Sequence, residues 1–128
     1  MDKGVSIAAA ARDLVGVRFR LQGRSAASGL DCVGLAALAL GGAVVLPPHY
    51  GLRSGNVGLA ERWLAAAGLR AVDLGAVGDL VLVRPGPLQL HLMVKVEGGH
   101  VHAHAGLRRV VEMPGASPWP VIGHWRMI

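Results

Sequence analysis

The sequence predicts an α+β fold in which N-terminal helices pack on a small antiparallel sheet. Apolar residues recur with the helical period of 3.6 up to about residue 67 and alternate with the strand period of 2 beyond it. Helices that precede strands, rather than alternate with them, are typical of segregated α+β layers. The 128 residues contain no repeat or linker and are 52% hydrophobic, so we expect one domain over residues 1–128 with a single core.

Three helices are predicted, over Ser6–Leu14, Cys32–Leu40 and Asn56–Ala67. Ser6 and Asn56 are the expected N-caps, because their side-chain oxygens accept hydrogen bonds from the first amides of a helix. Glycine, which adopts the left-handed conformation that ends helices, follows at Gly16, Gly41 and Gly68. The second helix is apolar on nearly every face, so we expect it to be buried.

Extended segments are predicted over Val17–Leu21, Leu80–Val83, His91–Glu97, His100–His104, Arg108–Met113 and Val121–Met127. Gly98 and Gly99 are expected to form a hairpin turn between two of these strands. Asp79 precedes the first long strand, where we interpret it as a turn residue. Loops are expected over Gln22–Gly29, Pro47–Gly55 and Pro114–Pro120.

The chain is basic, with a formal net charge of +5. Such a charge favours anionic partners such as acidic wall polymers, membranes or nucleic acid. The arginines are scattered, and one Phe and one Tyr make no stacking platform, so we expect no nucleic-acid partner. The longest apolar run, Cys32–Leu46, has 15 residues, fewer than the roughly 18–20 that span a membrane.

The N-terminal alanine-rich stretch is short and is interrupted by Arg12 and Asp13, so we expect no signal peptide and synthesis in the cytoplasm. The single cysteine excludes an intramolecular disulfide.

Cys32 is the candidate nucleophile. It follows a polar, glycine-bearing loop and Asp31, and it begins the apolar helix. The partial positive charge of a helix N-terminus favours the thiolate. Histidines follow at His91 and beyond, and a lone cysteine with distant histidines is typical of Cys/His hydrolases. The alternative interpretation is that Cys32 is a small buried apolar residue, as most free cysteines are.

The histidine run allows a competing interpretation. His100, His102 and His104 point to one side of a strand, because side chains alternate with period two. With His91 on the adjacent strand, they could bind zinc alone or with Cys32. A thiolate that binds zinc cannot act as a nucleophile, so the two interpretations exclude each other. We expect His49 and His124 to be surface or packing residues.

Five segments resemble the NlpC-type cell-wall cysteine peptidases. Two surround the cysteine: Gly16-Val17-Arg18-Phe19-Arg20-Leu21-Gln22-Gly23-Arg24-Ser25 and Gly29-Leu30-Asp31-Cys32-Val33-Gly34-Leu35. Three form the histidine-bearing part: Gly78-Asp79-Leu80-Val81-Leu82, His91-Leu92-Met93-Val94 and Gly98-Gly99-His100-Val101-His102-Ala103. The resemblance implies a papain-like α+β fold, no cofactor, and hydrolysis of peptidoglycan stem peptides. The C-terminal part, with Trp119 and Trp125, looks most like the branch encoded among tail genes of phages and gene transfer agents.

By position, the resemblance implies that Cys32 is the nucleophile, His91 the general base and later acid, and His102 the residue that orients His91. The Cys32 amide at the helix start is the expected oxyanion donor. The family usually has tyrosine where Phe19 stands, and its hydroxyl is thought to assist near the oxyanion.

Arg24, Asp31 and Phe19 are the candidate substrate-binding residues. The main role expected of Asp31 is a helix N-terminal cap or a structural hydrogen bond. Arginines in loops near the expected cleft either contact substrate carboxylates or form a solvated face. They are Arg18, Arg20, Arg24 and Arg53.

The sequence therefore predicts a peptidase that cleaves stem peptides, by resemblance between D-glutamate and the next diamino acid. We expect it to be carried on a phage-like tail, with a tail hub or tail-tip protein as partner. Two alternatives stay open: a structural or adaptor protein of the tail tip, and a zinc-binding or acyl-transfer domain on the same scaffold.

Overall fold

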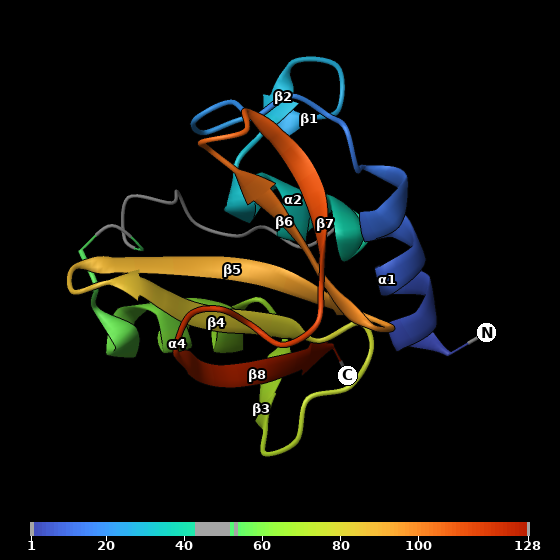
Figure 1. The fold of residues 1–128 in the computed structure, drawn as a ribbon. Helices are drawn as coiled ribbons and strands as arrows, with labels where there is room; N and C mark the ends of the chain where they lie inside the picture. Colours follow the sequence, from blue (N-terminus) through green and yellow to red (C-terminus); the bar gives the residue numbers. More distant parts are fainter. Residues whose placement is uncertain (1, 43–51, 53, 128) are drawn as a thin grey trace.

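The computed structural model describes residues 2–42, 52 and 54–127 (Figure 1). In chain order the elements are α1 (Lys3–Asp13), β1 (Arg24–Ser25), β2 (Gly29–Leu30), α2 (Cys32–Ala39), α4 (Val57–Ala66), β3 (Leu69–Val72), β4 (Leu80–Gly86), β5 (Gln89–Val96), β6 (Gly99–His104), β7 (Arg109–Pro114) and β8 (Val121–Met127). The predicted α+β class is confirmed. Most of the predicted Pro47–Gly55 loop, with His49 and Arg53, lies outside the described residues.

Helix α1 begins three residues earlier than predicted. Asp2, not Ser6, is its N-cap, and the Asp2 side chain accepts a 2.6 Å hydrogen bond from the Gly4 amide. The Ser6 hydroxyl instead donates to the Asp2 carbonyl. The predicted end is confirmed, with Leu14 as C-cap and Gly16 at a φ of 95°.

Helices α2 and α4 lie where the sequence predicts them. The Asp31 side chain caps α2, and the Asn56 side chain caps α4 by accepting from the Leu59 amide. Gly41 and Gly68 follow the two helices with positive φ, as expected for helix ends.

Six antiparallel strands form the main sheet in the order β3-β8-β4-β5-β6-β7. The sequence prediction missed β3, a four-residue strand that pairs with β8. It also missed the β1–β2 hairpin inside the predicted loop over Gln22–Gly29, because strands of two residues show no periodicity. The turn between β5 and β6 lies one residue earlier in the chain than predicted, since Gly99 already belongs to β6.

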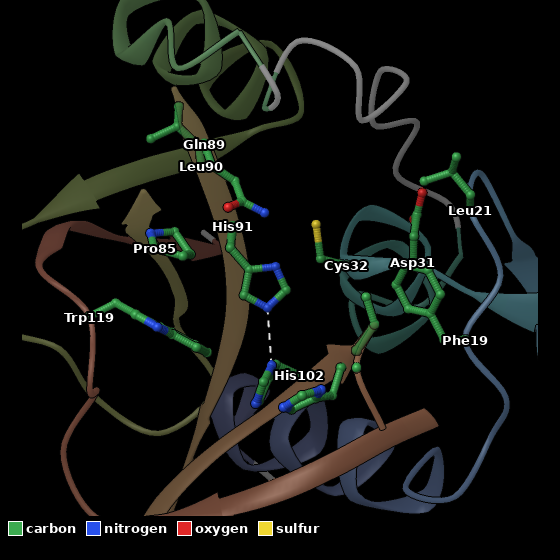
Figure 2. Close-up of a pocket in the computed structure, with 14 residues that line it drawn as sticks. Phe19, Leu21, Asp31, Cys32, Pro85, Gln89, Leu90, His91, His102 and Trp119 are labelled. Carbon is green, nitrogen blue, oxygen red and sulfur yellow. Dashed lines mark hydrogen bonds between the residues drawn. The ribbon is translucent and has the colours of Figure 1, made fainter. Parts of the chain in front are cut away.

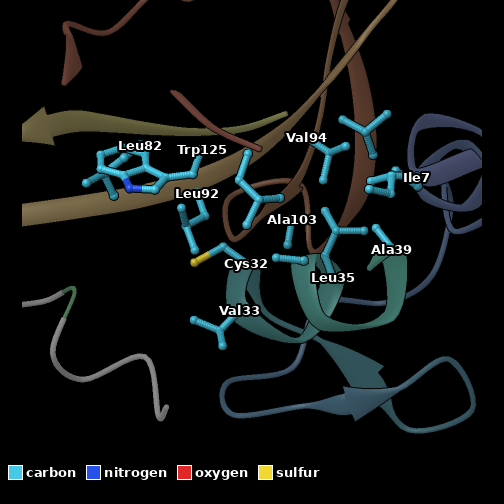
Figure 3. Close-up of a cluster of buried hydrophobic side chains, with 14 of the residues drawn as sticks. Ile7, Cys32, Val33, Leu35, Ala39, Leu82, Leu92, Val94, Ala103 and Trp125 are labelled. Atoms are coloured by element: carbon cyan, nitrogen blue, oxygen red, sulfur yellow. The ribbon is translucent and has the colours of Figure 1, made fainter. Parts of the chain in front are cut away.

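The core occupies both faces of the sheet. Helices α1 and α2 pack on the face beside β5, where Leu35, Leu92 and Ala103 belong to the larger cluster (Figure 3). On the other face, a smaller cluster contains Val83 and Met93. The connection from β7 to β8 passes across this face (Figure 1). Because the first four residues of β4 are covered on both sides, they are continuously apolar rather than alternating.

Asp79 holds the entry to β4. Its side chain is 1% exposed, accepts from the Ala76 amide at 2.7 Å, and pairs with the Arg126 guanidinium at 2.9 and 3.0 Å. The predicted turn role is confirmed, and the carboxylate also ties this turn to β8.

Strands β5 and β6 separate towards one end. Their pairing runs only from Val96 with Gly99 to Val94 with Val101, while β6 continues with β7 as far as His104. The separation opens a space beside the start of α2. Of the helices in the described part of the chain, none is long and apolar enough to span a membrane.

Candidate active site

A cavity of about 270 Å³ lies where β5 and β6 separate, next to the start of α2 (Figure 2). It brings together five of the six predicted site residues and leaves out Arg24. Its lining includes Phe19, Leu21, Asp31, Cys32, Pro85, Gln89, Leu90, His91, His102, His104 and Trp119.

Cys32 is the first residue of α2 and is 9% exposed. The Asp31 side chain binds the Gly34 amide. The Cys32 amide is the first of the helix and lies beside the Cys32 thiol. Amides at a helix start are able to bind a negatively charged oxygen.

His91 and His102 form a hydrogen-bonded pair, with 3.1 Å between His91 Nε2 and His102 Nδ1. The other ring nitrogen of His91 faces Cys32 (Figure 2). If His91 Nε2 donates to His102, then His91 Nδ1 is unprotonated and able to accept the thiol proton. Both Cys32 and His91 are described, and no hydrogen bond joins them, so their predicted contact stays a prediction.

Trp119 covers the histidine pair, a role that the sequence analysis missed. Its ring meets His91 and His102 edge-on, with centroids 5.8 and 5.5 Å away. Ser117 holds the loop by bonding the Trp119 amide and carbonyl at 3.0 and 2.8 Å. An aromatic residue in a predicted loop was the available signal, but only the fold shows which strands that loop crosses.

Asp31 organises the loop before Cys32. It is 2% exposed, and its two oxygens accept from the Gly34 and Gln22 amides at 2.8 Å each. Arg24 Nη1 lies 2.8 Å from Asp31 Oδ1. The capping role is confirmed; substrate binding by Arg24 and Asp31 stays a prediction.

Replacing Asp31 with alanine should lower the free energy of unfolding by about 2–4 kcal/mol, because it removes a cap and leaves buried donors unpaired. Urea denaturation measures the loss. Asn56→Ala, which removes an exposed cap from α4, is the control and should cost about 1 kcal/mol. Equal losses in the two variants would contradict the organising role of Asp31.

Phe19 is half-buried beside Asp31 in the cavity wall (Figure 2). A bridge to Leu30 holds its backbone against β2. The ring therefore lies near Cys32, as the resemblance implies, while a substrate contact stays a prediction.

The alternative zinc site is not formed. Among the described residues, no three His, Cys, Asp or Glu side chains are close enough to hold a metal ion. His102 Nδ1 is bonded to His91, and His104 Nδ1 accepts from the Leu107 amide at 3.0 Å.

Comparison with solved structures identifies the fold of this chain. No protein-family model and no curated protein sequence matches the chain. Among solved structures, NlpC1 from Trichomonas vaginalis matches with a TM-score of 0.73 and 18% identity, over 98% of this chain and 45% of that one. The peptidoglycan hydrolase RipB from Mycobacterium tuberculosis matches with a TM-score of 0.65 and 24% identity, over 98% of this chain and 65% of RipB. The chain has the NlpC/p60 fold.

One similar NlpC/p60 structure is non-catalytic. RipD from Mycobacterium tuberculosis, described as adapted to peptidoglycan binding, matches with a TM-score of 0.64 and 17% identity, over 100% of this chain and 98% of RipD. The chain spans about half the length of NlpC1. The NlpC/p60 fold is therefore compatible with both hydrolysis and binding.

Burial in this NlpC/p60 fold keeps the side chains of Cys32, His91 and His102 uncharged. It raises the pKa of Cys32 to about 12, an effect that the nearby Leu92 amide opposes. It lowers the pKa of His91 to about 3 and that of His102 to about 4, and neighbouring histidines add to both shifts. The sequence had predicted that the helix start favours the thiolate; desolvation of the buried sulfur outweighs this effect.

Iodoacetamide should therefore alkylate Cys32 slowly at pH 7, roughly a hundredfold or more below its rate in urea-unfolded protein, because only the thiolate reacts. The rate should keep rising as the pH passes 9, since the raised pKa postpones ionisation. Mass spectrometry of the folded and unfolded protein across this range measures both effects. Rapid alkylation of the folded protein at pH 6 would instead indicate a thiolate–imidazolium pair.

Proposed function

We propose that this chain is a cysteine peptidase that hydrolyses peptidoglycan stem peptides between D-glutamate and the diamino acid that follows it. The observation that carries the proposal is one cavity in which a thiol at a helix start faces a hydrogen-bonded histidine pair. The similarity to RipB, a peptidoglycan hydrolase, supports the substrate class. The resemblance of the segments around Cys32 and His91 to the NlpC-type peptidases supports the choice of the cleaved bond.

In the proposed reaction, proton transfer accompanies attack. Cys32 Sγ bonds to the substrate carbonyl carbon while its proton passes to His91 Nδ1, because burial disfavours the free thiolate. The carbonyl oxygen becomes an oxyanion. The C–N bond then breaks, and His91 returns the proton to the leaving amine. Water, deprotonated by His91, hydrolyses the thioester and regenerates the thiol.

The other groups prepare this step. His102 accepts from His91 Nε2 and so keeps Nδ1 unprotonated and directed at Cys32. The Cys32 amide at the helix start is the proposed oxyanion donor. Trp119 shields the histidine pair from water and so preserves its neutral state.

Incubation with purified sacculi and with a defined stem peptide, each with and without EDTA, tests the proposal. We expect release of peptide fragments that chelation does not reduce, because no step uses a metal ion. Loss of activity with EDTA and its recovery with zinc would contradict this mechanism.

Phe19→Tyr should raise turnover by about tenfold to a hundredfold if the new hydroxyl reaches the oxyanion. The ring changes only by that hydroxyl, so steric effects are small. A misplaced hydroxyl would be buried unpaired and would cost about 1–3 kcal/mol of stability. Turnover and melting temperature are measured on the same sample. Lower stability without faster turnover would show that position 19 does not face the oxyanion.

A second candidate function is binding without hydrolysis, as a structural or adaptor protein. The raised thiol pKa of Cys32 and the missing hydroxyl at Phe19 favour it. Binding of sacculi with no release of fragments, by both the natural chain and Phe19→Tyr, would support this function over hydrolysis.

We further propose that the chain acts on a phage-like tail particle, with a tail hub or tail-tip protein as partner. The resemblance of its C-terminal part to the tail-associated branch supports this location, and its +5 charge suits an anionic wall polymer. Co-sedimentation of the chain with purified tail particles tests it. A chain that stays in the soluble fraction would contradict it.

A further inference from the structure

Two arginines face each other where the segment before β1 meets β7, next to His104 of the cavity lining. Arg18 pairs with Arg109, the first residue of β7. Two backbone hydrogen bonds, 2.9 and 2.8 Å long, join residues 17–19 to residues 108–110 on either side of this pair. Arg18 and Arg109 are therefore a non-hydrogen-bonded antiparallel pair, in which Cα atoms lie about 4.5 Å apart and side chains point the same way.

No carboxylate of the described residues lies within 4 Å of either guanidinium. Like charges directly across a strand pair are destabilising. At the opposite edge of the sheet, Arg70 also faces an arginine, Arg126, but there Asp79 forms two hydrogen bonds with Arg126. The fold supplies an anion for one arginine pair and leaves the other without one.

His104 extends the pair towards the cavity. It lies directly across from Arg109 in the β6–β7 pairing and therefore on the same face. Its Nδ1 accepts from the Leu107 amide, so Nε2 carries the proton and is able to donate. Its ring centroid lies 5.5 Å from that of His102, so the row of donors reaches the catalytic histidines of the proposed mechanism.

Two neighbours add positive charge beside this arginine pair. Arg20 lies on the same side as Arg18, because a Cβ built on Gly29 would approach both side chains, at 2.6 and 2.9 Å. Arg108 has a φ of 60°, a conformation that favours glycine. Arginine at this position, in the turn beside the cavity, is strained in a way that is common near functional sites.

We propose that Arg18, Arg109 and His104 form a carboxylate-binding site that holds an acidic group of the peptide beside the cleaved bond. A carboxylate between the two guanidinium groups would accept hydrogen bonds from both, and its attraction to each of them would offset their mutual repulsion. This inference rests on the proposed function. It assigns substrate recognition to Arg109, which the sequence analysis did not single out.

The test uses the tripeptide L-Ala-γ-D-Glu-diamino acid and its amidated form, in which the D-Glu α-carboxylate is a carboxamide. Binding is measured by calorimetry on the Cys32→Ala protein, alone and with Arg109→Gln or Arg18→Gln. Arg70→Gln, which removes the same charge at the opposite edge of the sheet, with four strands between, is the matched control. Cleavage of both peptides by the natural chain is measured separately.

We expect amidation to weaken binding by roughly tenfold with Arg109 present and to have no effect in Arg109→Gln or Arg18→Gln. Arg70→Gln should behave like its parent. Removing one arginine should also leave the melting temperature unchanged or higher at low salt, because repulsion is relieved.

Failures of the two proposals give different results. Cleavage without a preference for the free carboxylate would overturn the carboxylate site and leave the peptidase intact. Arginine-dependent binding without cleavage would leave the site intact and overturn the peptidase. Absence of both binding and cleavage would overturn both. A lower melting temperature in Arg109→Gln with unchanged peptide binding would show a structural role instead.

Discussion

Cys32→Ala should reduce stem-peptide hydrolysis at least about a thousandfold, because the proposed mechanism has no other nucleophile. The free energy of unfolding should fall by no more than about 1–2 kcal/mol, since the substitution removes one heavy atom from the edge of the core. Chromatography of the peptide products and thermal melting measure the two effects.

Cys32→Ser is the matched variant, because it keeps an atom of similar size and replaces only the thiol. We expect it to be nearly as inactive, since a hydroxyl is a much weaker nucleophile than a thiol beside the same histidine. Full activity in Cys32→Ala would show that hydrolysis occurs elsewhere or in a contaminant.

His91→Ala should reduce kcat/KM about as severely as loss of Cys32, because His91 both accepts and returns the proton. His102→Ala should be milder, roughly tenfold to a hundredfold, because His102 only holds His91 in one tautomer and orientation. Steady-state kinetics on defined peptide measures both.

His102→Asn provides the control, since an amide oxygen is able to accept from His91 in place of the ring nitrogen. Partial recovery relative to His102→Ala is expected, without any change in the inactivity of His91→Ala. Equal losses in His91→Ala and His102→Ala, with no recovery in His102→Asn, would contradict the orienting role.

The helix ends were predicted well because capping residues and terminating glycines act on backbone groups only a few positions away in the sequence. Asn56 and Gly68 bound α4 as expected. The predicted start of α1 was wrong because Asp2 and Ser6 are both residue types that cap helices well. The choice depends on tertiary contact: Gly4 lies so close to the Val77 carbonyl that a Cβ there would be 2.3 Å from it.

The candidate site was only partly predictable, because it combines residues that the chain order keeps apart. The motifs identify Cys32, His91 and His102. They do not reveal that the β7–β8 connection brings Trp119 over the histidines, or that residues 17–19 pair with β7 and place Arg18 opposite Arg109. Nor does a sequence give the burial that raises the pKa of Cys32.

The short pairing between β5 and β6 has a mechanical consequence. His91 belongs to the larger part of the sheet, and His102 belongs to the β6–β7 hairpin, which the sheet holds mainly through Val94–Val96 and Gly99–Val101. The hydrogen bond between the two histidines crosses this seam. Bending at the seam would widen the cleft and stretch that one bond while leaving the strand pairing on either side intact. The bond between the two histidines therefore adds a side-chain link between the two parts of the sheet at the end where their strands do not pair.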